Sequence, residues 1–393
     1  MALESSIFHL LLFSILLPSG ALLTLHTLQA HSESIRPARI LQENNSSRAS
    51  NSSSNSSYVP AMFIFGDSSA DCGTGIINRW LQERADHLPY GRDFDTHRPT
   101  GRFCNGRIPV DYLAQRLGLP FVPPWLPRFR GMQDVLHGMN YASAGAGILS
   151  FNALDRGNMI SFMQQVGLFT ETFQQIQTRR GARDAIDMIS KSLFYISIGS
   201  NDFIHYLLQN SSGVQSRYWP WEFNQLLVRN IRNELRSFYD THARRMVVMG
   251  VAPLGCAPYY LSHYRSWNGG CVEAINNMIF EFNTAMRFMV YELGQELPDA
   301  NITFCDAFEG FMDIVKNYQS YGFQTVTDAC CGFGKYGGWF MCRADITCRN
   351  ASNHIWWDRF HPTDRVNAIL ADNVWSGMHS KMCYPVYLQE MVS

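Results

Sequence analysis

Four short apolar runs constrain the fold of this chain more than any other feature of its sequence. Continuous apolar runs of about four to eight residues are typical of strands that are buried on both faces, as in a parallel sheet. The four runs are Ala61–Phe65, Leu193–Ile198, Met246–Met249 and Ile302–Cys305. The sequence therefore predicts a central, mainly parallel β-sheet.

Two segments between these runs carry apolar residues at helical spacing. The first set is Leu226, Leu227, Ile231, Leu235 and Phe238, and the second is Ile275, Met278, Phe282, Met286, Met289 and Leu293. Strands that alternate with helices predict a three-layer α/β/α sandwich. No second core or later linker is evident, so we expect residues 58–393 to form a single α/β domain.

The first apolar run ends on Gly66, Asp67 and Ser68. In open α/β sheets ligands bind beyond the carboxyl ends of the strands, and a glycine there lets the chain turn sharply into a helix. Ser68 is thus placed where a nucleophile would face a cleft. The alternative is a helix cap, because Asp and Ser after a strand commonly fill that role.

An acid and an imidazole lie three residues apart near the other end of the chain, at Asp358 and His361. Asp358 can accept a hydrogen bond from one ring nitrogen, which leaves the other nitrogen free to take a proton from Ser68. Taken alone, such a pair also fits a solvated surface pair or half of a metal site. The combination with Ser68 favours nucleophilic catalysis.

Two stretches could supply donors to an oxyanion: the glycine-rich segment 138–148, and the segment 193–202, which contains Asn201. Small residues let backbone N–H groups approach a tetrahedral intermediate, and an Asn amide at a strand end is a neutral donor. Close packing and turn formation are the structural alternatives for both stretches.

Four blocks together resemble the plant GDSL esterase/lipase family, which belongs to the SGNH hydrolases. They are Gly66 to Ser68, Gly145 to Gly147, Gly199 to Asp202, and Asp358 to His361. Supporting segments match at 99–107, 251–258 and 361–363, so the resemblance spans roughly residues 58–385. The order and wide spacing of these motifs make the resemblance specific.

The resemblance implies that Ser68 is the nucleophile, His361 the general base and then acid, and Asp358 the residue that orients His361. It implies an acyl-Ser68 intermediate, which water or an acceptor alcohol then resolves. It also implies an oxyanion hole made by the Ser68 N–H, the Asn201 side-chain amide and one glycine N–H.

Two glycines remain candidates for that last donor. Gly145 is the first choice because it lies five residues after Asn140, and Gly147 is the alternative. Two departures from the family pattern leave the shape of the cleft open. Ser69 stands where the family usually has leucine, and Gly73-Thr74-Gly75 replaces the more familiar Gly-Asn-Asn.

The expected function is that of a secreted serine esterase or lipase acting on a small-molecule or polymer-bound ester. One alternative is an acyltransferase on cutin or wall polysaccharide, and another is a non-catalytic secreted binding glycoprotein. The strict Gly-x-Ser-x-Gly elbow of the α/β-hydrolases is absent. No cofactor and no metal is expected, since the sequence lacks a His-Glu-x-x-His, a Cys-x-x-Cys and a phosphate loop.

The amino-terminal residues predict secretion to the extracellular space, the apoplast or cell wall in a plant. Residues 1–30 have the pattern of a signal peptide, with cleavage near Ala21 or Ala30 left open. Residues 31–57 are rich in Asn and Ser and are predicted to be disordered. The candidate N-glycosylation sites are Asn44, Asn45, Asn51, Asn55, Asn210, Asn301 and Asn350.

The chain has 10 cysteines, all beyond the predicted signal peptide, and an even number in a secretory chain predicts disulfides. The resemblance implies a bond between Cys256 and Cys271. Adjacent Cys330 and Cys331 are expected to reach other partners, with Cys342, Cys348 and Cys383 as candidates. A further hypothesis pairs Cys72 with Cys104.

The formal net charge of −1 does not favour a nucleic acid or an acidic membrane surface as partner. After removal of the signal peptide, no remaining apolar run is long enough to span a membrane. A histidine base works in its neutral form, and imidazoles ordinarily titrate near pH 6.5. We therefore expect activity to rise from acid to neutral pH.

Overall fold

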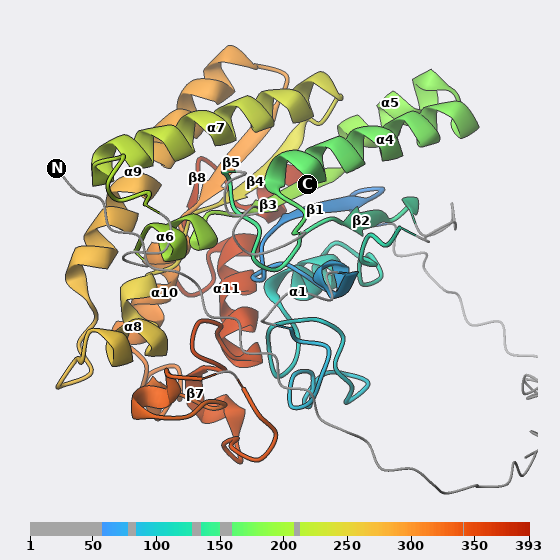
Figure 1. The fold of residues 1–393 in the computed structure, drawn as a ribbon. Coiled ribbons are helices and arrows are strands. Elements are labelled where there is room, and N and C mark those ends of the chain that lie inside the picture. Colours follow the sequence, from blue (N-terminus) through green and yellow to red (C-terminus); the bar gives the residue numbers. More distant parts are fainter. Residues whose placement is uncertain (1–56, 78–83, 128–134, 150–158, 208–212, 341) are drawn as a thin grey trace, which may run out of the picture. The chain divides into compact units, whose positions relative to one another are not determined.

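A six-stranded sheet lies at the centre of the residues that the structure describes (Figure 1). This computed structural model describes residues 57–77, 84–127, 135–149, 159–207, 213–340 and 342–393. The strand order is β2-β1-β3-β4-β5-β8; β8 runs antiparallel to β5 and all other neighbours are parallel. The strands are β1 (Met62–Gly66), β2 (Gly138–Asn140), β3 (Leu193–Ser197), β4 (Arg245–Met249), β5 (Asn301–Cys305) and β8 (Cys383–Tyr384).

The four strands predicted from apolar runs are β1, β3, β4 and β5, and each boundary lies within one residue of its prediction. Their residues are almost entirely buried, as expected for strands covered on both faces. Strands β2 and β8 were not predicted, because three and two residues are too few to show a periodic pattern. A separate pair, β6 (Thr325–Ala329) and β7 (His354–Trp356), forms a two-stranded parallel sheet.

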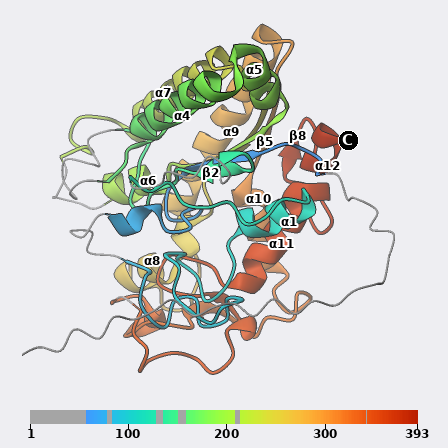
Figure 2. The ribbon, with the colours of Figure 1, turned by 90° about the vertical axis from the view of Figure 1, so that its right-hand side faces the viewer.

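Helices cover both faces of the six-stranded sheet, as Figures 1 and 2 show. One face carries α4 (Phe162–Arg180), α5 (Ala182–Lys191), α7 (Pro220–Asp240) and α9 (Glu273–Glu296). The other carries α1 (Pro109–Arg116), α10 (Ala307–Lys316), α11 (Asp364–Ser376) and α12 (Leu388–Val392). The remaining α-helices of the described residues are α6 (Ser200–Leu207) and α8 (Pro258–His263). This is the predicted α/β/α arrangement.

The two predicted helical stripes face the core. In α7 four of the five predicted positions, Leu227, Ile231, Leu235 and Phe238, are buried, and Leu226 is half-buried. In α9 all six predicted positions are buried. Phe238 of α7 packs on Phe65 of β1, with ring centroids 4.5 Å apart, and Phe169 of α4 packs on Phe63 at 5.1 Å. These aromatic contacts hold β1 between its neighbours.

The carboxyl ends of four parallel strands lie in one row. Gly66 pairs with Ser197, Ser197 with Met249, and Met249 with Cys305. Gly66 has a φ of 156°, and a Cβ at this position would lie 2.1 Å from the carbonyl oxygen of Ser197. Only glycine therefore fits where β1 approaches β3 and the chain turns into Asp67 and Ser68.

Eight cysteines form four disulfides. Cys256 is joined to Cys271, the pairing that the resemblance implied. The adjacent pair also separates as expected, with Cys330 joined to Cys348 and Cys331 to Cys342. The fourth bond joins Cys305 of β5 to Cys383 of β8, so Cys383 does not serve the adjacent pair.

The hypothesis of a Cys72–Cys104 disulfide is wrong, because both thiols are free and buried. The two sulfur atoms lie in different surroundings. Cys72 donates to the carbonyl of Val122 at 3.4 Å, whereas the sulfur of Cys104 accepts from the side chain of Asn367 at 3.3 Å. The segments that carry the two cysteines are linked differently, by Arg102, whose guanidinium donates to the carbonyl of Cys72 at 3.4 Å and forms a buried ion pair with Asp111.

Several predictions fall on residues outside the described ranges. These are the signal peptide, residues 31–56 of the Asn/Ser-rich segment, and the candidate glycosylation sites Asn44, Asn45, Asn51, Asn55 and Asn210. Asn301 and Asn350 are described and exposed, as a glycan requires. Within the described ranges, no helix combines the length and the apolar character needed to cross a membrane.

Candidate active site

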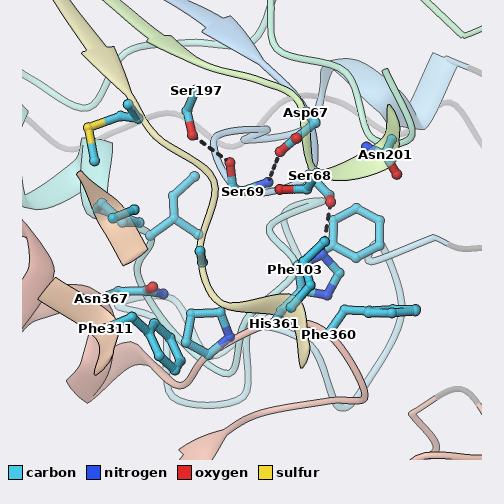
Figure 3. Close-up of a pocket in the computed structure, with 18 of the residues that line it drawn as sticks. Asp67, Ser68, Ser69, Phe103, Ser197, Asn201, Phe311, Phe360, His361 and Asn367 are labelled. Atoms are coloured by element: carbon cyan, nitrogen blue, oxygen red, sulfur yellow. Dashed lines mark hydrogen bonds between the residues drawn. The ribbon is translucent and has the colours of Figure 1, made fainter. Parts of the chain in front are cut away.

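Ser68, His361 and Asp358 form a continuous chain of hydrogen bonds at the row of strand ends. Figure 3 shows its first link, between Ser68 and His361. The Oγ atom of Ser68 lies 2.8 Å from Nε2 of His361. Nδ1 of His361 lies 2.8 and 2.9 Å from the two carboxylate oxygens of Asp358. Residues almost 300 positions apart are thus brought into the order that a nucleophile, its base and an orienting acid would need.

Asp358 is buried and held as a carboxylate. Burial by itself raises the pKa of Asp358, but the His361 imidazole and hydrogen bonds from the backbone N–H groups of Phe360 and His361 outweigh it, so this pKa is lowered. Nδ1 of His361 faces this carboxylate, and Nε2 faces Oγ of Ser68, so the two ring nitrogens contact the two groups separately.

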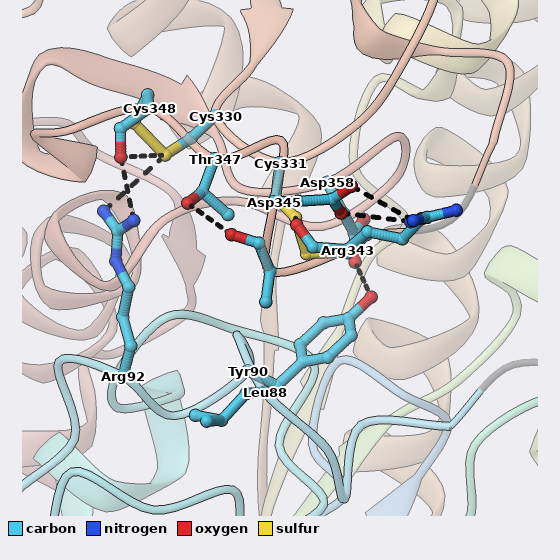
Figure 4. Close-up of a disulfide and its surroundings, with 12 residues drawn as sticks. Leu88, Tyr90, Arg92, Cys330, Cys331, Arg343, Asp345, Thr347, Cys348 and Asp358 are labelled. Carbon is cyan, nitrogen blue, oxygen red and sulfur yellow. Dashed lines mark hydrogen bonds and ion pairs between the residues drawn. A yellow bond between two sulfur atoms is a disulfide. The ribbon is translucent and has the colours of Figure 1, made fainter.

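Tyr90 and Phe103 complete the surroundings of this triad, and the sequence analysis assigned neither of them a role. The hydroxyl of the fully buried Tyr90 donates to Oδ2 of Asp358 at 2.8 Å (Figure 4). The ring of Phe103 lies against His361 with centroids 4.9 Å apart. Phe103 belongs to segment 99–107, which matches the family pattern, so this match could have marked Phe103 as part of the site. Nothing in the sequence around Tyr90 indicates that its partner is Asp358.

The candidate oxyanion donors surround Ser68. Gly145 lines the pocket with a φ of 80°, whereas Gly147 is buried and outside the pocket lining, which favours Gly145 of the two. The amide nitrogen of Asn201 donates one hydrogen to the carbonyl of Ala146 at 2.9 Å, which orients the amide at the site. Within the described ranges, the backbone N–H groups of Ser68 and Gly145 have no backbone acceptor.

Two buried carboxylates hold the loop that carries Gly145. Asp71 accepts from the N–H of Gly73 at 2.7 Å and from the N–H of Ala144 at 2.8 Å. Asp202, next to Asn201, accepts from the N–H groups of Ile148 and Leu149. The Gly73-Thr74-Gly75 departure from the family pattern thus leaves this loop anchored, since the N–H groups of Gly73 and Gly75 both donate to Asp71.

Burial raises the pKa of Asp71 to about 6, although these backbone hydrogen bonds lower it. Asp67, before the nucleophile, is also buried; its pKa is raised by burial, and its Oδ1 accepts from the N–H of Ser69 at 2.9 Å. Both acids therefore hold loops around Ser68, and Asp358 is the acid that contacts His361.

A pocket of about 840 Å³ opens at Ser68. This is the size range of sites that enclose most of a small organic ligand. It includes Ser68, His361, Gly145 and Asn201, so the reactive groups and the oxyanion donors face the same space. A nucleophile, its base and these donors around one cavity are the groups that acyl transfer requires.

Comparison with known proteins agrees with this geometry. The model of the GDSL-like lipase/acylhydrolase family matches residues 62–374. GDSL esterase/lipase At1g71691 of Arabidopsis thaliana is 39% identical over 337 residues, which are 85% of this chain and 86% of that protein. GDSL esterase/lipase 7 of the same plant is 38% identical over 339 residues, covering 85% and 92% of the two chains.

Among solved structures, an acetylxylan esterase from Geobacillus stearothermophilus is similar over 82% of this chain and 95% of its own. The sequence identity is 11% and the TM-score is 0.37.

Proposed function

Because the chain belongs to the family of GDSL-like lipases and acylhydrolases and is a carboxylic ester hydrolase, we propose that it cleaves esters through an acyl intermediate on Ser68. The observation that carries the proposal is the hydrogen-bonded chain from Ser68 through His361 to Asp358. A protein that only binds a ligand would not need this chain of hydrogen bonds. It would also not need three hydrogen-bond donors that converge beside Ser68.

In the first half of the reaction, Oγ of Ser68 attacks the ester carbonyl while Nε2 of His361 takes its proton. The negative charge that develops on the carbonyl oxygen is stabilised by the N–H groups of Ser68 and Gly145 and by the amide of Asn201. His361 then protonates the leaving alkoxide, and the acyl group remains on Ser68.

In the second half, His361 takes a proton from water, and the hydroxide attacks the acyl-Ser68 carbonyl. The same donors hold the second oxyanion, and its collapse releases the carboxylic acid and regenerates the Ser68 hydroxyl. Asp358 stays ionised throughout and stabilises the imidazolium that forms twice in each cycle. Its lowered pKa supports this assignment.

The test is hydrolysis of p-nitrophenyl butyrate by the full chain and by Ser68→Ala. The account predicts that the variant retains less than about one thousandth of the wild-type kcat. Ser237→Ala, in α7 and outside the pocket, is the matched control and should keep the wild-type rate. Equal rates for the wild type and Ser68→Ala, with both folded by circular dichroism, would overturn the mechanism.

We also propose that the enzyme is secreted. The predicted signal peptide and the four disulfides support this, since such bonds form and persist in oxidising compartments. Sequencing the amino terminus of the protein recovered from culture medium should show a start within or just beyond residues 22–31. Retention of Met1 in a cytosolic fraction would contradict the proposal.

A further inference from the structure

The pocket extends well beyond the catalytic groups, along the row of strand ends. From Ser68 it passes Ser197 at the end of β3, Met249 at the end of β4, and Ala307, which follows β5 and begins α10. Because these strand ends lie level with one another, the cavity follows the carboxyl edge of the sheet away from β1. We call this part of the pocket the chamber.

The chamber has mainly apolar walls, which come from the end of β4, from α10 and α11 on one face of the sheet, and from neighbouring segments. Its apolar residues are Ile108, Met249, Leu254, Ala307, Phe311, Trp356, Leu370 and Val374. Each of them is at most 8% exposed, so they line the inside of the molecule and not an open surface. Burial of an extended hydrocarbon here would be favourable, because both partners leave water.

Ser69 lies where the chamber meets the catalytic groups. Its Oγ is 2.8 Å from Oγ of Ser197, and both residues line the pocket. In Figure 3 Ser69 and Ser197 lie on the same side of Ser68 as Phe311 and Asn367, whereas Asn201 lies on the other side. A larger, branched side chain at position 69 would project into the space between Ser68 and the chamber.

We propose that the chamber is the acyl site, that it takes an unbranched fatty acyl chain, and that Ser69 sets the width of its entrance. This inference rests on the proposed function, because it needs an acyl group attached to Ser68. An ester carbonyl whose oxygen points to Asn201 directs its acyl chain to the side of Ser69 and its alcohol toward His361, which protonates the leaving oxygen. The chamber then receives the acyl chain and leaves the alcohol side open.

The experiment measures kcat/KM for p-nitrophenyl acetate, butyrate, octanoate, laurate and palmitate, all with the same alcohol. For the wild type, kcat/KM should rise by up to about fourfold for each added methylene until the chamber is filled. Ser69→Leu should lower the ratio of kcat/KM for laurate to that for acetate by at least about tenfold. Leu370→Trp, which narrows the chamber farther from Ser68, should lower the ratio of kcat/KM for laurate to that for butyrate.

Matched controls make the same substitutions outside the pocket. Ser237→Leu and Leu226→Trp, both in α7, should keep the wild-type preference for chain length. Ser68→Ala in the same series separates the two proposals. If Ser68→Ala abolishes hydrolysis while Ser69→Leu slows every ester equally, the acylation mechanism stands and the proposed acyl site is overturned. A wild-type enzyme that prefers acetate to the longer esters would also overturn the proposed acyl site.

A second measurement does not depend on turnover. A bromine-labelled dodecanoate should quench tryptophan fluorescence in the inactive Ser68→Ala protein, because Trp356 lines the chamber. Adding Leu370→Trp, which narrows the space without removing Trp356, should weaken dodecanoate binding by at least about tenfold. Equal binding by both proteins would place the fatty chain elsewhere and overturn the inference.

Discussion

The hydroxyl of Tyr90 donates a hydrogen bond to Oδ2 of Asp358, 268 residues away in the sequence, at 2.8 Å. Both side chains are buried. Each oxygen of the acid is therefore engaged, Oδ1 by His361 and two backbone N–H groups, and Oδ2 by Tyr90 and His361. Tyr90 does not touch the reacting atoms, and we assign it the role of positioning the acid.

Replacing Tyr90 by Phe should lower kcat several-fold and move the acid limb of the pH–activity profile to higher pH. The reason is that a carboxylate with one donor fewer interacts more strongly with the imidazolium of His361, which then loses its proton less readily. Profiles of kcat/KM between pH 5 and pH 9 measure this shift.

The matched control is Tyr141→Phe, which removes another buried tyrosine hydroxyl, bonded to Thr172 at 2.8 Å. It should cost stability without moving the profile. If Tyr90→Phe and Tyr141→Phe give profiles that superimpose on that of the wild type, Tyr90 is only a packing residue.

Replacing Asn201 by Ala should lower kcat by about a hundred- to a thousandfold with little change in KM, because its amide acts on charge that exists only in the transition state. Steady-state kinetics on p-nitrophenyl butyrate give the two constants. Asn230→Ala removes a side-chain amide that donates to the carbonyl of Leu226 in α7, and it should leave both constants unchanged. An Asn201 variant that changes only KM would remove Asn201 from the oxyanion hole.

Thermal stability and activity should respond to pH in opposite directions. Burial raises the pKa of Asp71 and of Asp306 to about 6, and it also raises that of Asp67. Each of these acids binds its proton more tightly in the folded chain than in the unfolded chain, whose value is near 3.9. The free energy of unfolding therefore falls as pH rises through about 6.

Differential scanning fluorimetry should show a higher Tm at pH 5.5 than at pH 7.5, while esterase activity is lower at pH 5.5. His354 acts in the opposite sense, because partial burial lowers its pKa, but burial raises the pKa of Asp364 and Glu234 as well as that of the three acids above. Asp71→Asn should reduce the pH dependence of Tm. A Tm that climbs from pH 5.5 to pH 7.5 would show that these acids titrate normally.

Thiol labelling distinguishes the observed cysteine pairing from the predicted Cys72–Cys104 bond. Without reduction, the native protein should take up no iodoacetamide, because both free thiols are buried. After unfolding in guanidinium chloride, still without reduction, Cys72 and Cys104 should be carbamidomethylated and the other eight cysteines should not. Peptide mapping that leaves Cys72 and Cys104 linked would contradict the structure.

The sequence predicted those parts of the fold that depend on local pattern. Strands β1, β3, β4 and β5 are apolar because both of their faces are covered, and this leaves a continuous run that can be read directly. Strands β2 and β8 form only because a longer neighbour offers its edge, so their short sequences contain no comparable signal.

The same division applies to the candidate site. The sequence motifs predicted a catalytic role for Ser68, Asp358 and His361 from their residue types. The structure places the three side chains in one chain of hydrogen bonds. The role of Tyr90 depends on a contact between distant segments, which no local pattern encodes. The pairing of Cys72 with Cys104 failed for a related reason, since closeness of two segments does not direct two sulfur atoms toward each other.

The most direct test of the account is to identify the residue that becomes covalently modified. The full chain is treated with diethyl p-nitrophenyl phosphate, which phosphorylates an activated serine, and the modified peptide is sequenced by mass spectrometry. The account predicts one diethylphosphoryl group, on Ser68, with inhibition proportional to its incorporation and much slower labelling in His361→Ala. Full inhibition with Ser68 unmodified, or labelling of another serine in step with lost activity, would contradict the central claim.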